Sequence, residues 1–189
     1  LIVVLLGAPG SGKSTHGIKL SKLLGIPHIS VGDLIRQEIL NQTKMGWVIK
    51  IYDQHFSDGL PDDILVGVLI RRIKREDCKY GFILDGFPKT ETQVSILKNV
   101  LLRTEDIHIP IFLSLSKENI KSRLQKRYIC PSCGVQVREV DNNPWPGYCP
   151  IDAKKGKMVL LINRSDDTNK KVLERRLKLF WKNKNMIIS

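Results

Sequence analysis

A glycine-rich run at residues 7–15, which reads G-A-P-G-S-G-K-S-T, carries the strongest chemical signal in the chain. It fits the phosphate-binding loop pattern G-x-x-x-x-G-K-[ST], in which successive backbone N–H groups surround one anion. Lys13 supplies a mobile charge for the β and γ phosphates, and Ser14 or Thr15 supplies a hydroxyl near the metal. Six apolar residues precede the run and a helical pattern follows it, which argues against a chance turn. We expect a nucleoside triphosphate to bind at these residues: Gly10, Ser11, Gly12, Lys13, Ser14 and Thr15.

Three of the four cysteines form a second chemical cluster. Cys130 and Cys133 make a C-x-x-C pair, and after fifteen intervening residues Cys149 and Asp152 make a C-x-x-D pair. Two close pairs joined by a longer arm are typical of a structural tetrahedral zinc site, in which a carboxylate is an acceptable fourth ligand. The alternatives are free thiols in a small insertion, or an Asp152 that takes no part. Cys78 has no partner motif, and we expect it to pack at a helix end.

Around these motifs, apolar runs alternate with helical periodicities, which is the pattern of an α/β fold with a parallel sheet. We expect strands over residues 1–6, 26–30, 82–85 and 107–115. We expect helices over residues 13–24, 33–41, 61–76, 90–102, 117–127 and 166–182. Asp33 is the expected N-cap of the second helix, while Asp62 and Asp63 favour the positive end of the third. Residues 128–162 break the alternation and read as an inserted subdomain.

Polar turns follow the first three predicted strands. The phosphate loop follows the first, Gly32 and Asp33 follow the second, and the turn at residues 85–89 follows the third. Ligands of open parallel sheets lie beyond the carboxyl ends of the strands, so these turns should meet at one rim. Asp85 is placed there like a carboxylate that orients Mg²⁺ or its waters. A turn-forming Asp before Gly86 is the alternative.

Length, composition and charge limit the number of domains and the kinds of partner that we expect for this chain. A length of 189 residues with 42% hydrophobic residues predicts one main domain with a small insertion, and no segment is long enough to span a membrane. The formal charge of +12 suits a polyanionic partner, with a solvated basic surface as the alternative. The chain does not begin with Met, so we expect a fragment whose targeting signal, if any, is not in view.

At this point the chain resembles a known family, the adenylate kinases. The resemblance covers nearly the whole chain and rests on these segments in the family's order: residues 7–15, 30–36 (S-V-G-D-L-I-R), 85–89, Gln93, Arg123-x-x-x-Arg127, Arg164-x-Asp166-Asp167 and Arg175. The cysteine array is similar to the zinc-binding lid of the long-form members. The resemblance implies reversible phosphoryl transfer from Mg·ATP to AMP, giving two ADP. It also implies a P-loop NTPase-type core of residues 1–127 and 163–189, which includes an acceptor flap at 31–60, and a zinc lid at 128–162.

The resemblance also assigns roles to individual residues. The expected AMP-binding residues are Ser30, Arg36, Leu60, Gly86, Lys89, Gln93, Arg164 and Arg175. Arg123 and Arg127 join the donor site, and the catalytic set is Lys13, Asp85, Lys89, Arg123, Arg127, Arg164 and Arg175. Surface salt bridging is the alternative for these arginines and suits Arg176 best. Asp166 and Asp167 either cap the last helix or pair with lid charges. The implied protein is an intracellular monomer, cytoplasmic or mitochondrial, that binds nucleotides and neither nucleic acid nor membrane.

Four features depart from the family pattern. Lys89 stands where the family has arginine, so this position lacks the bidentate fork of a guanidinium. Ser14 replaces the usual glycine, and residues 57–62 (S-D-G-L-P-D) are out of step with the usual G-x-L-V-P-D. Family members continue past this C-terminus into a further strand and helix that help to hold the donor base.

These departures keep other functions open. A GTP:AMP phosphotransferase is the nearest alternative, because the donor-base site is the part least visible in this sequence. A catalytically impaired nucleotide-binding protein is suggested by Lys89 and the C-terminus. A nucleic-acid-binding protein is suggested only by the charge and the zinc array, without aromatic stacking platforms or a recognition helix. Uridylate and cytidylate kinases share the phosphate loop but usually carry a short lid without zinc.

Overall fold

A computed structural model describes residues 1–55, 60–101, 108–138 and 144–188. The chain forms two compact units. The first unit comprises Leu1–Gly7, Gly12–Ser114 and Lys182–Ser189. The second unit comprises Ala8–Ser11 and Leu115–Trp181.

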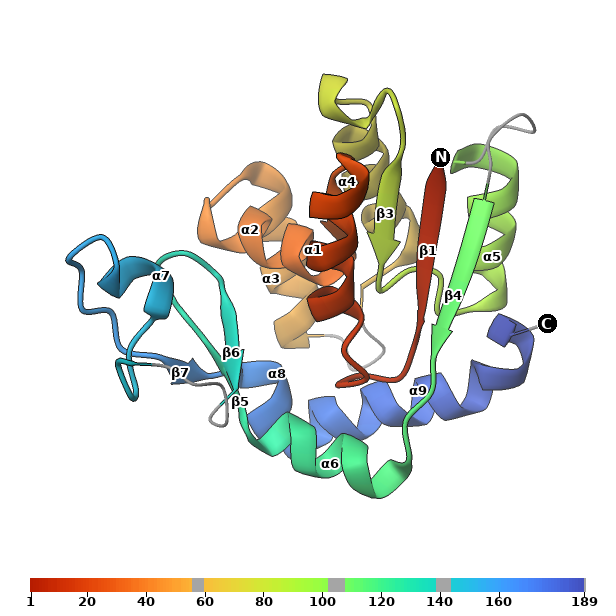
Figure 1. Ribbon diagram of the computed structural model, residues 1–189. Helices are drawn as coiled ribbons and strands as arrows, with labels where there is room; N and C mark the ends of the chain where they lie inside the picture. Colours follow the sequence, from red (N-terminus) through yellow and green to blue (C-terminus); the bar gives the residue numbers. More distant parts are fainter. Residues whose placement is uncertain (56–59, 102–107, 139–143, 189) are drawn as a thin grey trace. The chain divides into compact units, whose positions relative to one another are not determined.

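A parallel four-stranded sheet is the centre of the first unit (Figure 1). Its strands, in the order β2-β3-β1-β4, are β2 (His28–Ser30), β3 (Phe82–Asp85), β1 (Ile2–Gly7) and β4 (His108–Leu113). The register pairs Leu5 of β1 with Asp85 of β3, and Ser30 of β2 with the same Asp85. The predicted α/β class and parallel sheet are therefore confirmed.

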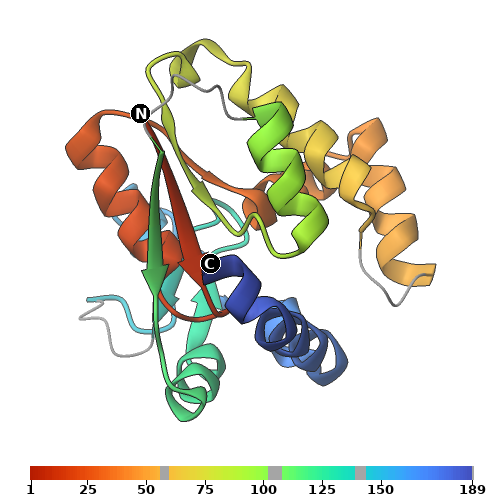
Figure 2. The same cartoon turned by 90° about the vertical axis from the view of Figure 1, so that its right-hand side faces the viewer.

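Helices cover both faces of this sheet, α1 (Lys13–Leu24) on one side and α4 (Asp62–Ile73) with α5 (Glu91–Ile96) on the other (Figure 2). Side chains alternate along β1, so Val3 and Leu5 join the core that contacts Leu20 of α1. Ile2 and Val4 join the second core, which the helices on the other side complete. A strand buried on both faces must be apolar at successive positions, which explains the continuous apolar run.

Helix ends differ from the sequence predictions in several places. Helix α2 (Val31–Leu40) is capped by Ser30, whose hydroxyl accepts a hydrogen bond from the Asp33 N–H at 3.3 Å, so the prediction of Asp33 as N-cap is wrong. The helix predicted over 61–76 ends at Ile73, because Arg75 is extended and starts the separate 3₁₀ turn η1 (Glu76–Cys78). Helix α5 continues as the π-helical segment η2 (Leu97–Leu101).

Helices α2 and α3 (Lys44–His55) pack closely where Gly46 faces the backbone of α2. A Cβ on Gly46 would lie 2.0 Å from the Glu38 carbonyl oxygen, so only glycine fits this crossing. The two helices belong to the predicted acceptor flap. Residues 56–59 of that flap lie outside the described residues, while Leu60 is half-buried.

The second unit contains a small antiparallel sheet, in the order β6-β5-β7. Its elements are α6 (Lys117–Gln125), β5 (Arg127–Ile129), β6 (Gln136–Arg138), α7 (Pro150–Ala153), β7 (Ile162–Asn163), α8 (Ser165–Thr168) and α9 (Lys170–Ile188), whose last residues belong to the first unit. The helix predicted over 117–127 ends at Gln125, because Arg127 pairs with Arg138 in the sheet. Among the described residues, no helix has the length and apolar content needed to cross a membrane.

Candidate nucleotide site and metal-ligating cluster

The phosphate loop has the backbone that its glycines permit. Gly10 and Gly12 have φ values of +79° and +100°, which residues with a Cβ adopt rarely. Gly12 is also the N-cap of α1 and provides no side-chain cap, so the first N–H groups of the helix remain available to an anion. The Ser11 hydroxyl is buried and makes no hydrogen bond to any described residue. A buried orphan hydroxyl in such a loop fits a phosphate ligand.

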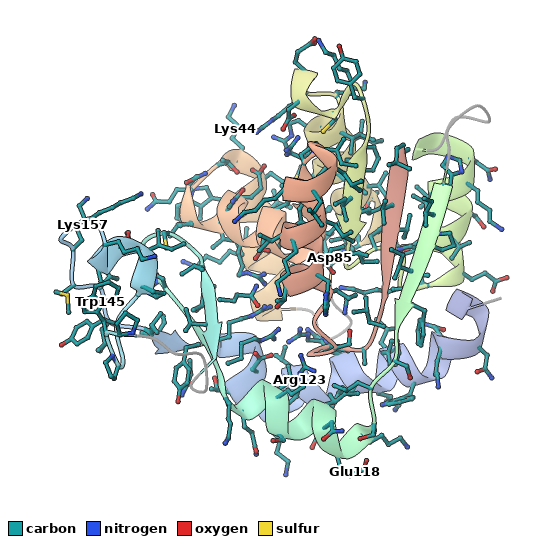
Figure 3. All side chains as sticks on the ribbon, in the orientation of Figure 1. Lys44, Asp85, Glu118, Arg123, Trp145 and Lys157 are labelled. Carbon is teal, nitrogen blue, oxygen red and sulfur yellow. The ribbon has the colours of Figure 1, made fainter. Side chains whose placement is uncertain are left out.

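Lys13 and Ser14 follow in the first turn of α1. The Lys13 ammonium donates a hydrogen bond of 2.9 Å to the Gly7 carbonyl and so folds back along the loop. The Ser14 hydroxyl instead donates a hydrogen bond of 2.6 Å to Oδ2 of Asp85. Asp85 is the last residue of β3 and is labelled in Figure 3. The loop and the end of β3 thereby share one polar cluster.

Asp85 is only 2% exposed, and its side chain is nevertheless an ionised carboxylate. Burial by itself would raise its pKa, but the nearby His28 imidazole, the Lys13 charge and the Ser14 hydroxyl together hold the pKa of Asp85 below its usual range. His28 Nε2 lies 3.4 Å from Asp85 Oδ2. An ionised carboxylate beside a serine hydroxyl offers the oxygen ligands that Mg²⁺ prefers, so these residues fit the metal that the sequence predicts.

On the acceptor side, Ser30 and Arg36 both lie on or next to α2. The Ser30 side chain caps the helix, as described above. The Arg36 guanidinium pairs with the Asp33 carboxylate one turn earlier. A Cβ on Gly32 would lie 3.4 Å from Arg36 Nη1, so the backbone approaches this guanidinium closely.

Lys89 and Gln93 lie around the start of α5, after Gly86, whose φ is +82°. Gln93 is 4% exposed, and its Oε1 accepts a hydrogen bond of 2.8 Å from the Lys89 N–H. Its Nε2 donates a hydrogen bond of 2.6 Å to Asp62 Oδ1 on α4. The Lys89 side chain is exposed, and its carbonyl accepts a hydrogen bond of 2.9 Å from Asn183 Nδ2.

The predicted lid and hinge arginines lie in the second unit. Arg127 forms a bidentate pair with Asp167, with both N···O distances 2.6 Å, and Arg176 Nη1 approaches the same carboxylate at 3.0 Å. Burial, and next the charge of Arg164, lower the pKa of Arg127. Arg164 is itself buried, while Arg123 lies on α6 and Arg175 is half-buried on α9.

For Arg176, the salt-bridge interpretation is confirmed. Asp167 pairs with charges rather than capping α9, and the side chain of Asp166 lies outside the described part of the chain.

The cysteine array converges as its spacing predicts. One ligand atom each from Cys130, Cys133, Cys149 and Asp152 lie within 4.8 Å of one another. Gly134, with φ +73°, allows the turn after the first pair, and Cys149 caps the short helix that carries Asp152. Burial raises the pKa of the Cys130 thiol, while its hydrogen bond to Asp152 lowers the pKa of that carboxyl. Four converging protein ligands of these types are compatible with a structural zinc ion.

Sequence reasoning missed His28 and Asn183 entirely and treated Asp62 only as a helix-end charge. His28 could have been found from strand register, since it precedes Ser30 by two residues and therefore shares its face of β2. No local signal connects Asp62 with Gln93, because their contact joins two helices that are distant in sequence.

Comparisons with known proteins agree with this geometry. The family described as "Adenylate kinase" matches residues 5–189. An adenylate kinase of Staphylococcus aureus is 37% identical over 175 residues, which cover 92% of this chain and 79% of the relative. An adenylate kinase of Clostridium perfringens is likewise 37% identical over 175 residues, covering 92% of this chain and 78% of the relative.

Proposed function

The chain belongs to the adenylate kinase family, which makes it a nucleoside monophosphate kinase, and on that premise we propose that it transfers a phosphoryl group reversibly between Mg·ATP and AMP, giving two ADP. Such a transfer needs little covalent chemistry from the protein. Positioning of the two nucleotides and neutralisation of charge on the transferring group supply most of the rate.

The donor phosphates bind at the phosphate loop. Its N–H groups and the uncapped start of α1 hold the β and γ phosphates, and Lys13 exchanges its bond to the Gly7 carbonyl for phosphate oxygens. Magnesium supplies charge neutralisation between these phosphates when it is bound. Ser14 and Asp85 are the residues that would hold the ion or its waters, and the lowered pKa of Asp85 keeps that carboxylate ionised.

The acceptor binds between α2, the end of β3 and the start of α5. Arg36 exchanges its pairing with Asp33 for the AMP phosphate, while Gln93 contacts the adenine edge. Lys89 contacts the transferring phosphoryl group as a point charge, because lysine lacks the planar fork of an arginine guanidinium. The remaining proposed acceptor contacts are Ser30, Leu60, Gly86, Arg164 and Arg175.

The arginines of the second unit would complete the site when the lid at residues 128–162 closes. Guanidinium groups at Arg123 and Arg127 suit oxygens of the transferring phosphoryl group, and closure keeps water away from it. Excluding water favours transfer to AMP over hydrolysis. Zinc at the cysteine cluster would fix the fold of this small lid and take no part in the chemistry.

The observation that carries the proposal is the Ser14–Asp85 hydrogen bond, because it joins a phosphate loop to a buried, ionised carboxylate. The test is a coupled assay of ADP formation with zinc-loaded protein, AMP and either Mg·ATP or Mg·GTP. We expect AMP-dependent turnover with ATP as the better donor.

Faster turnover with GTP would identify a GTP:AMP phosphotransferase instead. Tight ATP binding without AMP-dependent turnover would identify a nucleotide-binding protein whose acceptor side is disabled. A Lys13→Ala variant is the control, because it keeps the loop glycines and removes the charge that the phosphates need.

A further inference from the structure

The side-chain amide of Gln93 is held at both ends. Its Oε1 accepts the Lys89 backbone N–H at 2.8 Å, and its Nε2 donates to Asp62 Oδ1 at 2.6 Å. The residue is 4% exposed and sits in the first turn of α5, where its own N–H is bound by the Thr90 hydroxyl at 3.2 Å. Backbone and side chain are therefore both fixed before any ligand binds.

Each partner of this amide can act in one sense only. A backbone N–H donates and never accepts, and an ionised carboxylate accepts and never donates. Asp62 lies in the first turn of α4, and its carboxylate accepts the bond from Gln93 Nε2. The oxygen of the Gln93 amide must therefore point to Lys89 and its nitrogen to Asp62, and the reverse orientation would lose both bonds.

An amide with these two bonds still has one N–H and one oxygen lone pair to offer. The edge of a 6-aminopurine presents a donor at the amino group and an acceptor at N1, whereas a 6-oxopurine presents the opposite pair. An amide free to flip would suit either edge. An amide fixed in one orientation suits one edge and meets the other with donor facing donor and acceptor facing acceptor.

We infer that Asp62 is a positioning residue that makes Gln93 selective for a 6-amino over a 6-oxo purine monophosphate. The inference rests on the proposed function, in which Gln93 contacts the acceptor base. Asp62 does not touch the base itself. It determines which base the amide can bind.

The test compares AMP with IMP as acceptors in wild-type protein and in Asp62→Asn. The asparagine can donate or accept, so the reversed Gln93 amide then loses only its bond to the Lys89 N–H instead of both bonds, and the cost of reversal falls. We expect the ratio of kcat/KM for AMP to that for IMP to fall roughly tenfold. Most of this fall in the ratio should come from changes in KM, whereas kcat for AMP should stay nearly constant. Asp62→Glu, which only accepts, should restore most of the wild-type ratio.

Asp63→Asn is the matched control. It removes the same charge from the same helix turn, but Asp63 is exposed, and its carboxylate accepts a local hydrogen bond of 2.9 Å from the Ile64 N–H. We expect its AMP-to-IMP ratio to equal that of the wild type. A ratio that falls equally in both variants would show that helix charge, not amide orientation, is responsible, and would overturn the inference.

The remaining outcomes separate the two proposals. Wild-type turnover with AMP, together with an unchanged ratio in Asp62→Asn, would overturn the role of Asp62 and leave the proposed function standing. No AMP-dependent turnover in the wild type would overturn both. If Asp62→Asn fails to fold, nitrogen-15 spectra of the wild type decide. One Gln93 amide proton shifted downfield by a carboxylate supports the inference, and two ordinary amide protons contradict it.

Discussion

Ser14 Oγ donates a 2.6 Å hydrogen bond to Oδ2 of Asp85, although 71 residues separate the two in sequence. Ser14 stands where the family usually has glycine. The Asp85 carboxylate is one of the most buried charged groups among the described residues. Their bond means that the departure is accommodated by an existing polar partner. It also brings one more oxygen ligand to the position where Mg²⁺ is proposed to bind.

Replacing Ser14 by Ala should therefore weaken the metal dependence of nucleotide binding. We expect the Mg²⁺ concentration needed for half-maximal ATP binding to rise by roughly threefold to tenfold, since one hydrogen-bonding group to a charged partner is lost. Titration calorimetry at several Mg²⁺ concentrations measures this. Ser21→Ala is the control, because the Ser21 hydroxyl lies near the other end of α1 and donates a hydrogen bond of 2.6 Å to the Ile26 carbonyl. An equal rise in both variants would contradict a metal-specific role.

Lys89→Arg should raise turnover. The guanidinium restores a planar fork for phosphate oxygens at an exposed position. We expect kcat/KM for AMP to rise by roughly tenfold, and steady-state kinetics with saturating Mg·ATP measure it. Lys79→Arg, an exposed lysine paired with Glu76, should leave the kinetics unchanged. An unchanged rate in Lys89→Arg would mean that other groups already supply the missing contact.

Cys149→Ser should abolish zinc binding. The thiol is fully buried among the four ligand groups, and a serine hydroxyl is a poor zinc ligand at neutral pH. We expect the zinc content to fall from about one ion per chain to near zero, with earlier proteolysis of the second unit. Mass spectrometry under native conditions and limited proteolysis measure both effects. Cys78→Ala, outside the cluster, should keep its zinc, and loss of zinc from that variant would argue against a specific site.

Two glycine substitutions should have opposite effects on stability. Gly46→Ala places a Cβ 2.0 Å from the Glu38 carbonyl oxygen, and we expect the free energy of unfolding to fall by about 1–3 kcal/mol. Gly67→Ala meets nothing within 4 Å on the exposed face of α4, and better helix propensity should raise the free energy of unfolding by about 0.5–1 kcal/mol. Urea denaturation of both variants tests the prediction. Similar losses in both would refute the close approach of α2 and α3.

The Arg72–Asp77 pair should give the stability a small acid dependence. Hydrogen bonds from Arg72 hold the pKa of Asp77 in the folded protein below its usual value. The pair therefore contributes to the free energy of unfolding at pH values above the pKa of Asp77 in the unfolded chain. This contribution disappears as the pH falls through the pKa of Asp77 in the folded protein. The carboxylate is half exposed, so screening limits the effect to about 0.2–1 kcal/mol. Denaturation of wild type and Asp77→Asn should differ at pH 7 and converge as pH falls below about 4. A difference that persists at low pH would assign the effect to packing instead.

Sequence patterns were sufficient wherever a local signal decides the structure. Residues 82–85 form the predicted strand, and residues 13–24 form the predicted helix, because an apolar run and an amphipathic period each end at a glycine or a polar turn. The cysteine spacing likewise predicted the four converging ligands. In these cases the residues that determine the structure are neighbours in sequence.

Helix boundaries and long-range contacts were predicted less well. Ser30 and Asp33 are both good N-cap residues, and only the register of β2 against β3 places the cap at Ser30. Arg127 fits the helical periodicity of the residues before it, but it pairs with Arg138 and is therefore part of β5. The contacts of Asp85 with His28, and of Gln93 with Asp62, depend on how elements distant in sequence pack together, which no periodicity reports.

The hydrogen bond from Asn183 to the Lys89 carbonyl joins groups that lie 94 residues apart in the chain. A ribosome adds about 5–20 residues per second, so Lys89 is synthesised roughly 5–20 s before its partner. Until then the turn after β3 lacks one of its supports, and the nascent first unit lacks the segment from Lys182 onward that completes it. Nascent chains stalled before Asn183 should therefore present this turn to chaperones and proteases in a less ordered form than released chains do.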